Sequence, residues 1–434
     1  MLFVNISLVF NLALVWWNSG LISIKLMLSF LIYSVALVHG LAWYLIGFKL
    51  YSYVNFDHQL NDVVTIYVLW LYYLSSNIYT YVVLEKDKAI PTKLVPLKRV
   101  TRIPFYFLCV LILMFTFLME GGATIISTDY KDIYESRPTT TTIANIVFTA
   151  LWVDAYGLVR SYTAQGKKFR IVIFTLVTAF VALWLILHAR RTEAIGFICI
   201  LLLHMKMVTG KTPVKYIVLA VLSLFLLYLI GYLRQEALLS SNIVEVIIDS
   251  LKPTFEGGGS RTEFANMPSG LGNIAATMQT SVYHFYHLGH EHLNGITIWV
   301  YPFKLLPTAL VNSMGFDPSP FFYNNIILEE YFYNGGTYLY APAYGNFGLP
   351  GMIIASFASG LLVNWTQKSF YSNDFIKIVI ATTIIFVFIK VVWYNVLPMI
   401  KAILYNLILL FYVAMIFSKK KKKDVAPQSN LELT

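Results

Sequence analysis

Cationic side chains gather within residues 188–304 of this sequence, where they could hold a phosphate-like anion. Two adjacent arginines lie in a very short turn between two apolar runs, and another closes a later apolar run. A guanidinium group binds two phosphate oxygens at once through parallel hydrogen bonds. The candidates are Arg190, Arg191, Arg234, Arg261 and Lys304. The alternative is that these cations pair with the neighbouring Glu193 and Glu236, or extend into water from helix ends.

The same part of the chain contains groups suited to acid–base chemistry. His284, His287, His290 and His292 are four of the eight histidines in the chain. Imidazole titrates near neutral pH and can take a proton from a hydroxyl. The candidates for a general base are, in order, His284, His287 and Glu263. A zinc site and a hydrated surface patch without a catalytic role are the alternatives for the four histidines.

Aromatic residues follow the histidines, between residues 301 and 344. Tyr301, Tyr338 and Tyr344 are the candidates for contacts with sugar, because a tyrosine ring offers an apolar face and a hydroxyl. The alternative is that these tyrosines belong to the aromatic belt that membrane proteins place at the interface.

Composition defines the class of protein that must position these groups. Of the 434 residues, 58% are hydrophobic and 12% charged, and the mean hydropathy is +0.67. Soluble domains carry about 25% charged residues, so a cytosolic enzyme, a disordered protein and a disulfide scaffold are excluded. The apolar residues form runs of about 20 without alternation, as membrane-spanning helices require. The predicted fold is therefore an all-α, polytopic integral membrane protein.

Eleven apolar runs are long enough to be spans. They cover about 2–17, 26–48, 63–84, 104–119, 143–162, 171–188, 194–208, 216–233, 347–365, 376–396 and 399–417. Residues 242–256 read as an amphipathic interfacial helix, and 273–288 as a helix. The apolar stretch 296–313 contains Pro302 and Pro307, so it is predicted to be re-entrant or interfacial and not a crossing.

Five consecutive lysines, 419–423, indicate which end of each span faces the cytoplasm. Such a run belongs on the cytoplasmic side, where it anchors the topology and attracts anionic lipid. With residues 418–434 as a cytoplasmic tail, most basic residues fall inside and most acidic residues outside. The chain is then one membrane domain, 1–434, with a large outer loop at 234–344. The net charge of +10 is explained by topology and does not indicate nucleic-acid binding.

Together these features resemble the O-antigen polymerase (Wzy) family of oligosaccharide repeat-unit polymerases. The resemblance rests on the arginine turn at 188–193, Arg234, the stretch 301–307, Gly335-Gly336-Thr337, the stretch 344–351, and Arg261 with Gly272. The general plan is similar over nearly the whole length, with about a dozen spans and one large late periplasmic loop.

The resemblance implies an activity and a site. The family belongs with integral-membrane C-type glycosyltransferases and is taken to act without metal or another cofactor. It transfers a growing glycan from undecaprenyl diphosphate to the next lipid-linked repeat unit, on the periplasmic side of the bacterial inner membrane. The expected partners are undecaprenyl-diphosphate-linked oligosaccharides, membrane lipid and a chain-length regulator protein. O-antigen ligase, and a flippase or transporter of lipid-linked oligosaccharide, are the alternative functions.

Overall fold

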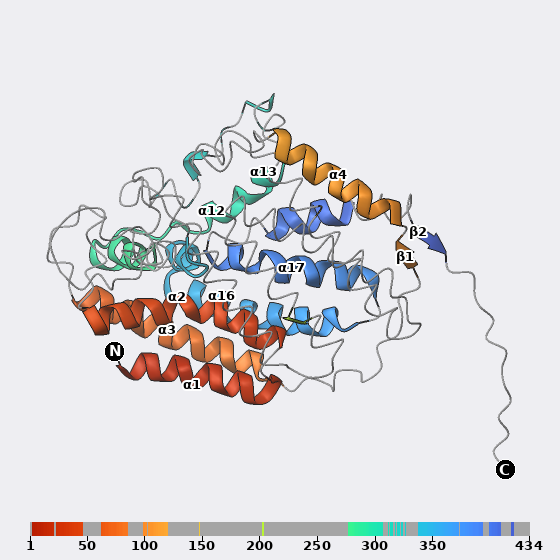
Figure 1. The fold of residues 1–434 in the computed structure, drawn as a ribbon. Helices are drawn as coiled ribbons and strands as arrows, with labels where there is room; N and C mark the ends of the chain where they lie inside the picture. Colours follow the sequence, from red (N-terminus) through yellow and green to blue (C-terminus); the bar gives the residue numbers. More distant parts are fainter. Residues whose placement is uncertain are drawn as a thin grey trace, which may run out of the picture.

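The computed structural model describes about half of the chain, in segments that lie mainly at its two ends. The described residues are 2–20, 23–46, 62–85, 99–101, 103–119, 147, 202–203, 277–306, 311, 313–315, 317, 319–321, 323, 326, 337–372, 374–393, 399–408 and 418–420. In these segments the chain is mostly helical (Figure 1), as the sequence predicts.

The elements follow the apolar runs of the sequence. In chain order they are α1 (Leu2–Ser19), α2 (Ile24–Ile46), α3 (Asp62–Val83), β1 (Arg99–Thr101), α4 (Ile103–Met119), η4 (Tyr283–His287), α12 (Ile296–Trp299), α13 (Tyr301–Leu305), η5 (Ser319–Phe321), α16 (Ala341–Phe370), α17 (Phe375–Trp393) and β2 (Ser418–Lys420). Helical turns also cover 277–282, and Met399–Ile408 is a further apolar helix.

Polar residues at the ends of the apolar runs set where several helices stop and start. Gly20 takes a positive φ of 84° after α1, and its N–H donates to the Trp16 carbonyl at 2.7 Å, as in a left-handed C-terminal cap. Ser23 caps α2 because its hydroxyl accepts the Leu26 N–H at 3.0 Å. Asp374 does the same for α17, where its carboxylate accepts the Ile376 N–H at 2.9 Å.

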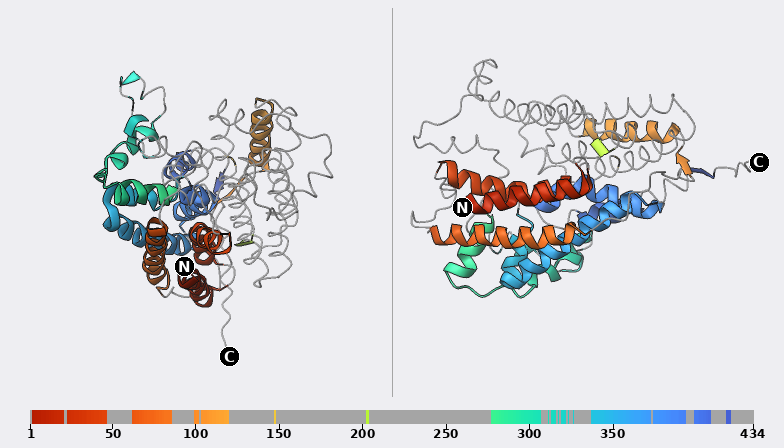
Figure 2. Two further views of the ribbon diagram at one scale, coloured as in Figure 1. Left: turned by 90° about the vertical axis from the view of Figure 1, so that its left-hand side faces the viewer. Right: turned by 90° about the horizontal axis from the view of Figure 1, so that it is seen from below.

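Five long helices form the packed part of the fold. α1, α2 and α3 lie side by side, α16 packs against α3 and α2, and α17 packs against α16 and α2 (Figures 1 and 2). Side-chain amides join them: Asn364 of α16 donates to the Val82 carbonyl of α3 at 2.7 Å. Asn11 of α1 donates to the Asn77 side chain of α3 at 3.3 Å. Polar contacts of this kind are typical of helices that associate in lipid.

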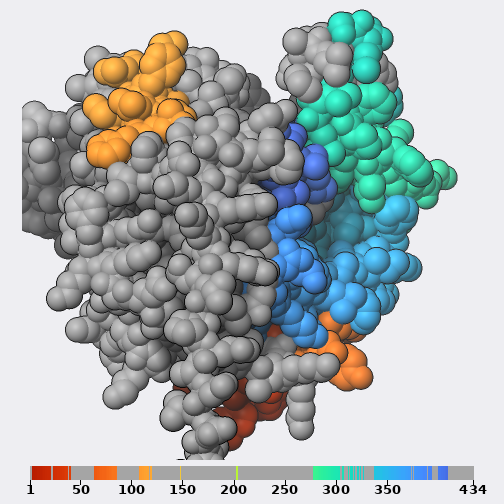
Figure 3. All heavy atoms as spheres, turned by 90° about the vertical axis from the view of Figure 1, so that its right-hand side faces the viewer, coloured from red at the N-terminus to blue at the C-terminus, as the bar shows by residue number. Residues whose placement is uncertain are grey.

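Some described helices bury polar side chains and expose large apolar ones. Asn5 and Asn11 of α1 are buried, whereas Phe3, Phe10 and Trp17 of the same helix are exposed. α4 exposes Phe107, Leu111, Met114, Phe115, Leu118 and Met119, and the helix lies on the surface of the molecule in Figure 3. Water would make such an apolar surface costly, whereas lipid would not.

Two of the described helices are long and apolar enough to cross a membrane, α1 and α16. This points to association with a membrane. The shorter apolar stretches are Ile24–Leu37, Phe107–Thr116, Ile376–Phe388 and Met399–Ile408.

The predicted spans can be compared with the helices wherever residues are described. The first four spans and the tenth agree with α1, α2, α3, α4 and α17 to within two or three residues at each end. The ninth is wrong at both ends, because α16 begins at Ala341 and runs to Phe370. The predicted spans between 143 and 233, apart from residues 147, 202 and 203, and the predicted helix 242–256 lie outside the described residues.

The all-α prediction missed one short ladder. β1 pairs with β2 in antiparallel fashion, with Arg99 opposite Lys420 and Thr101 opposite Ser418. The ladder lies at the right-hand side of Figure 1, toward which α1 runs from the N-terminus.

A lysine is buried where α3 ends. Lys25 Nζ donates to the Val83 carbonyl at 2.8 Å and to the Glu85 carbonyl at 3.0 Å. The last carbonyls of a helix have no partner within it and carry partial negative charge, so a cation stabilises them. Lys368, near the end of α16, forms an exposed ion pair with Glu85 at 3.8 Å. We call the surroundings of Lys25, Glu85 and Lys368 the lysine end of the bundle.

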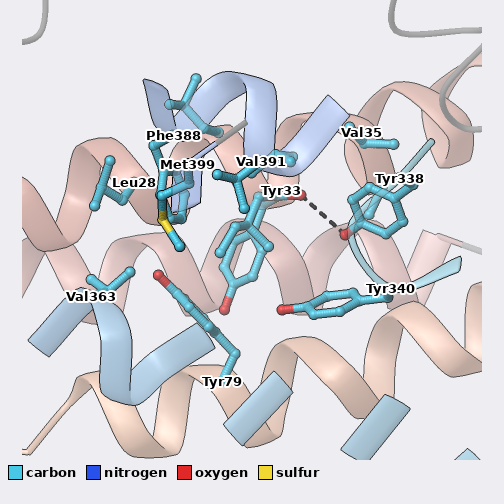
Figure 4. Close-up of a cluster of buried hydrophobic side chains, with 14 of the residues drawn as sticks. Leu28, Tyr33, Val35, Tyr79, Tyr338, Tyr340, Val363, Phe388, Val391 and Met399 are labelled. Atoms are coloured by element: carbon cyan, nitrogen blue, oxygen red, sulfur yellow. Dashed lines mark hydrogen bonds between the residues drawn. The ribbon is translucent and has the colours of Figure 1, made fainter. Parts of the chain in front are cut away.

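Tyrosines and apolar residues from α2, α3, α16, α17 and neighbouring segments fill the centre of the bundle (Figure 4). The Tyr33 hydroxyl donates to the Ser76 carbonyl at 3.0 Å, and the Tyr79 hydroxyl lies 2.9 Å from that of Ser29. Tyr33 and Tyr340 direct their hydroxyls toward each other in Figure 4. These hydrogen bonds let Tyr33 and Tyr79 be buried with their hydroxyls paired.

Replacing Lys25 tests the importance of this cap. We expect Lys25→Met to lower the free energy of unfolding by about 1–3 kcal/mol, because two buried carbonyls lose their donor. Lys368→Met should change it by less than about 0.5 kcal/mol, since exposed ion pairs contribute little. Unfolding by SDS in mixed micelles would measure both. Equal effects of the two substitutions would contradict this account of Lys25.

Candidate functional site

The histidine-containing segment is anchored by the helical turns that precede it. Residues 277–282 are all buried, and Gln279 Nε2 donates to the Thr65 hydroxyl of α3 at 2.9 Å. The Thr277 hydroxyl accepts the Tyr338 N–H at 3.0 Å. The predicted helix 273–288 is thus found over part of its length, inserted against the bundle, and it holds the next residues in place.

The four histidines begin where this segment widens into a π-helical turn, η4. The Leu288 N–H bonds to the Tyr283 carbonyl at 3.0 Å. Such wide turns are rare and frequent at functional sites. Phe285 is buried, whereas His287 and His290 are exposed and His284 is half-buried. Only the phenyl ring therefore points into the core.

The imidazole rings pair in a way that the sequence does not indicate. His284 stacks on His290, with ring centroids 4.2 Å apart and an interplanar angle of 19°. His287 stacks instead on Tyr283 at 5.2 Å. The predicted one-turn neighbours His284 and His287 therefore have different partners, and it is His284 and His290 that form a pair.

His292 has a positioning role toward helix α16. Its Nδ1 lies 3.3 Å from the Gly345 carbonyl, so in this contact Nδ1 carries the hydrogen. Its ring stacks on Phe285 at 4.9 Å and meets the edge of Tyr344 at 5.6 Å. His292 thus joins η4 to α16 and is poorly placed to act as a base through Nδ1.

Helix α16 is broken where His292 meets it. Gly348 has φ 63° and ψ −146°, and Pro350 follows within the helix. Because Pro350 has no N–H, the Asn346 carbonyl lacks its regular partner. That carbonyl accepts the Asn294 N–H at 3.0 Å, and the Gly345 carbonyl accepts the Leu293 N–H at 3.0 Å. The break in the helix leaves carbonyls that need such replacement partners.

Side chains reinforce the junction between 292–297 and α16. Asn346 Nδ2 donates to the Thr297 hydroxyl at 2.6 Å and to the Pro342 carbonyl at 2.7 Å. Asn294 and Gly295 both take a positive φ, of 49° and 82°, as tight two-residue turns require. The stretch 344–351, singled out in the sequence, is therefore part of a broken helix that is hydrogen-bonded to residues 293–297.

An array of aromatic rings runs from the histidines to α3. Tyr344 of α16 meets the edge of Tyr67 at 6.4 Å. Tyr67 stacks on Tyr286 of η4 with ring centroids 4.5 Å apart and an interplanar angle of 10°. Tyr67 also stacks on Trp70 at 5.8 Å. We call Tyr286, Tyr67 and Trp70 the aromatic stack.

The candidate glycan-binding tyrosines differ in position. Tyr338 is only 1% exposed and donates to the Ile32 carbonyl at 3.3 Å (Figure 4), so it is a core residue and we remove it from the site. Tyr344 is 3% exposed and contacts the rings of His292 and Tyr67 in edge-to-face arrangements. Tyr301, in α13, is half-buried.

Two phenols near the histidines are unsuited to act as bases. Burial raises the pKa of Tyr301 and of Tyr323. The Tyr323 hydroxyl also forms a short hydrogen bond with Ser281. Both phenols therefore stay protonated at neutral pH.

Only one of the predicted cations, Lys304, lies among the described residues. Lys304 is in α13. The helices α12 and α13 are short and interrupted, in agreement with the prediction that 296–313 is not a simple crossing. Arg190, Arg191, Arg234, Arg261 and Glu263 lie outside the described residues. Their roles stay predictions.

The histidines were also considered as zinc ligands. Within the residues that the structure describes, no three histidine, cysteine, aspartate or glutamate side chains are arranged to hold a metal ion. The described part of the chain therefore gives no support to that alternative.

Sequence reasoning missed Tyr67, Tyr286 and Trp70. Tyr67 and Trp70 fall inside a predicted span, and Tyr286 lies among histidines that drew attention first. The spacing of Tyr67 and Trp70, at i and i+3 on α3, was a usable signal, since residues so spaced share a helix face.

The comparisons with known proteins give no relative to guide the assignment. No protein-family model, no curated protein and no solved structure matches this chain.

Gly348 combines two obstacles to a side chain, a close neighbour and a positive φ. An added Cβ would lie 2.9 Å from His292 Nε2, and its φ of 63° suits glycine. We expect Gly348→Ala to lower the free energy of unfolding by about 1–3 kcal/mol. Gly315→Ala is a matched control, since Gly315 has a similar φ of 67° with nothing within 4 Å of the added Cβ.

The comparison separates contact from backbone strain. Because Gly315→Ala adds strain alone, it should cost less than Gly348→Ala in SDS unfolding. The double variant His292→Ala/Gly348→Ala should be less destabilised than the sum of the two single variants. Full additivity would show that His292 and Gly348 do not interact.

Proposed function

We propose that this chain is a membrane glycosyltransferase of the O-antigen polymerase type, which joins lipid-linked oligosaccharide repeat units. It acts on the periplasmic side of the bacterial inner membrane, with residues 418–434 in the cytoplasm. The growing glycan passes from undecaprenyl diphosphate to the next lipid-linked unit. About eleven spans would carry the site.

The observation that carries the proposal is the gathering of imidazoles and aromatic rings at one end of the bundle. The histidine-containing segment contacts α3 and α16 near their first residues, where Tyr286 stacks on Tyr67 and His292 meets Tyr344. Lys25 and Lys368 lie where the same two helices end. Sugar-handling groups are thus one helix length from the lysine end. This agrees with a glycan site on one side of a membrane and basic loops on the other.

The chemistry needs a base and an anion-binding group. The acceptor hydroxyl oxygen attacks the anomeric carbon, and the bond from that carbon to the diphosphate oxygen breaks. An imidazole, His284 first and His287 second, takes the hydroxyl proton. The departing diphosphate keeps the bonding electrons, and Arg190, Arg191, Arg234, Arg261 and Lys304 are proposed to stabilise its charge.

Exposed apolar side chains support the membrane part of the proposal. Those of α1 and α4 would contact lipid, and buried polar residues such as Asn11 and Asn364 would join helices inside the bundle. The same surface would let a polyprenyl carrier approach from the side.

A transporter of lipid-linked oligosaccharide is the second candidate. It is favoured by polar side chains buried within the helices, a feature that a transport path requires. His39 is one example: its Nδ1 lies 3.4 Å from the Tyr72 hydroxyl in the core between α2 and α3. The imidazole pair at the end of the bundle favours the enzyme over this alternative.

Deletion of the gene followed by gel display of surface polysaccharide tests the proposal. A polymerase predicts single repeat units on the lipid anchor. Polymer that stays on the carrier would identify a ligase, and absence of lipid-linked repeats outside the membrane would identify a flippase. A normal polysaccharide ladder would refute all three functions.

Substitutions in the proposed machinery should stop polymerisation without loss of the protein. We expect His284→Ala, Arg234→Ala and Arg261→Ala each to lower the rate by about 10²–10³, as loss of one electrostatic or acid–base group does. Lys368→Ala, at the lysine end, is the control. Chain-length ladders at equal membrane protein level measure the effect. Wild-type ladders from all three variants would contradict the assigned roles.

A further inference from the structure

The aromatic stack has the geometry of a platform for a sugar ring. Tyr286 is 53% exposed and Trp70 43% exposed, and both stack on Tyr67, at 4.5 Å and 5.8 Å. The interplanar angles are 10° and 23°, so the three rings are close to parallel. Each outer ring is supported on its inner side by Tyr67.

The Tyr286 ring is held in place before any ligand arrives. It belongs to the π-turn η4, whose neighbour Phe285 is buried. Its partner Tyr67 is in turn fixed by the edge of Tyr344. A surface that is already ordered loses little conformational freedom when it binds, which favours affinity.

Exposed polar residues follow Tyr286 on its own segment. His287, His290 and Glu291 follow Tyr286 within five residues, and all three are exposed. A sugar offers an apolar face of C–H groups and a rim of hydroxyls. An aromatic face with hydrogen-bonding groups beside it fits both parts.

The composition around Tyr286 distinguishes it from a surface for lipid chains. On α3, Val63 and Ile66 are exposed beside Trp70, which suits acyl chains. Tyr286 instead has ionisable neighbours, and an acyl or polyprenyl chain would gain nothing from them. The occupant that fits is therefore the glycan and not its lipid carrier.

We propose that Tyr286, supported by Tyr67, is a glycan-binding platform that stacks on one sugar ring of the oligosaccharide. This rests on the proposed function for the identity of the glycan. The platform belongs to the same π-turn as His284, the proposed base.

Binding, measured apart from polymerisation, tests the platform. The probes are the host's repeat-unit oligosaccharide, released from its carrier by mild acid, and undecaprenyl phosphate, which has no sugar. Protein in lipid nanodiscs would be titrated with each probe and followed by ligand-observed NMR. We expect Tyr286→Ala to weaken oligosaccharide binding by about tenfold and to leave undecaprenyl phosphate binding unchanged.

Two further variants keep the result interpretable. Tyr286→Trp retains a flat ring and should stay within about threefold of the wild type, which separates loss of stacking from misfolding. Tyr81→Ala removes a different exposed tyrosine, which lies on α3 toward the lysine end of the bundle, and should have no effect. Unchanged oligosaccharide binding by Tyr286→Ala would overturn the proposal. Weaker binding of undecaprenyl phosphate alone would also overturn it, in favour of a lipid-chain site.

The outcome is separable from that of the proposed function. If deletion of the gene stops polymerisation but Tyr286→Ala binds oligosaccharide normally, only the platform is refuted. If deletion leaves the polysaccharide ladder intact while Tyr286→Ala loses oligosaccharide binding, the platform stands and the polymerase proposal fails. Absence of oligosaccharide binding by the wild type refutes the platform.

Discussion

The break in α16 is the constraint on which the candidate site depends. A regular helix through residues 345–350 would satisfy its own carbonyls and leave nothing to bind the chain at 292–294. Pro350 and Gly348 free that part of the backbone, and the N–H groups of Leu293 and Asn294 bond to it. His292 adds a side-chain contact. The exposed histidines are thus attached to the rigid bundle through backbone hydrogen bonds, which hold geometry better than a surface loop does.

The bundle combines an apolar core with buried polar contacts and an apolar outer surface. Asparagine amides, tyrosine hydroxyls and one lysine form hydrogen bonds among the buried hydrophobic side chains, while phenylalanine and tryptophan face outward on α1 and α4. In water this arrangement would expose apolar surface and bury polar groups, both unfavourable. In lipid the apolar surface costs nothing, and each polar contact joins two helices. The distribution is explained most simply by a membrane environment.

Hydrophobicity was a sufficient guide to the long helices and an insufficient one to the site. α1, α2, α3, α4 and α17 match the predicted spans because apolar runs end at polar caps such as Ser23 and Asp374. The predicted start of the ninth span, residue 347, lies at the break of α16, and the apolar run gave no sign that the chain is already helical from Ala341. The interruption is bridged by contacts from residues about fifty positions away, and no local pattern encodes such contacts.

The tyrosines show why residue type alone could not define the site. Tyr338 and Tyr286 are equally suited by chemistry to bind sugar, and only Tyr338 was proposed from the sequence. Their surroundings decide otherwise: Tyr338 donates its hydroxyl to a backbone carbonyl inside the bundle, whereas Tyr286 lies at the surface on a parallel ring. Tyr286 belongs to the π-turn η4, in which Phe285 is buried and Tyr286 is exposed. The platform therefore depends on how η4 packs against Tyr67 of α3, a contact between residues far apart in the chain that residue type does not encode.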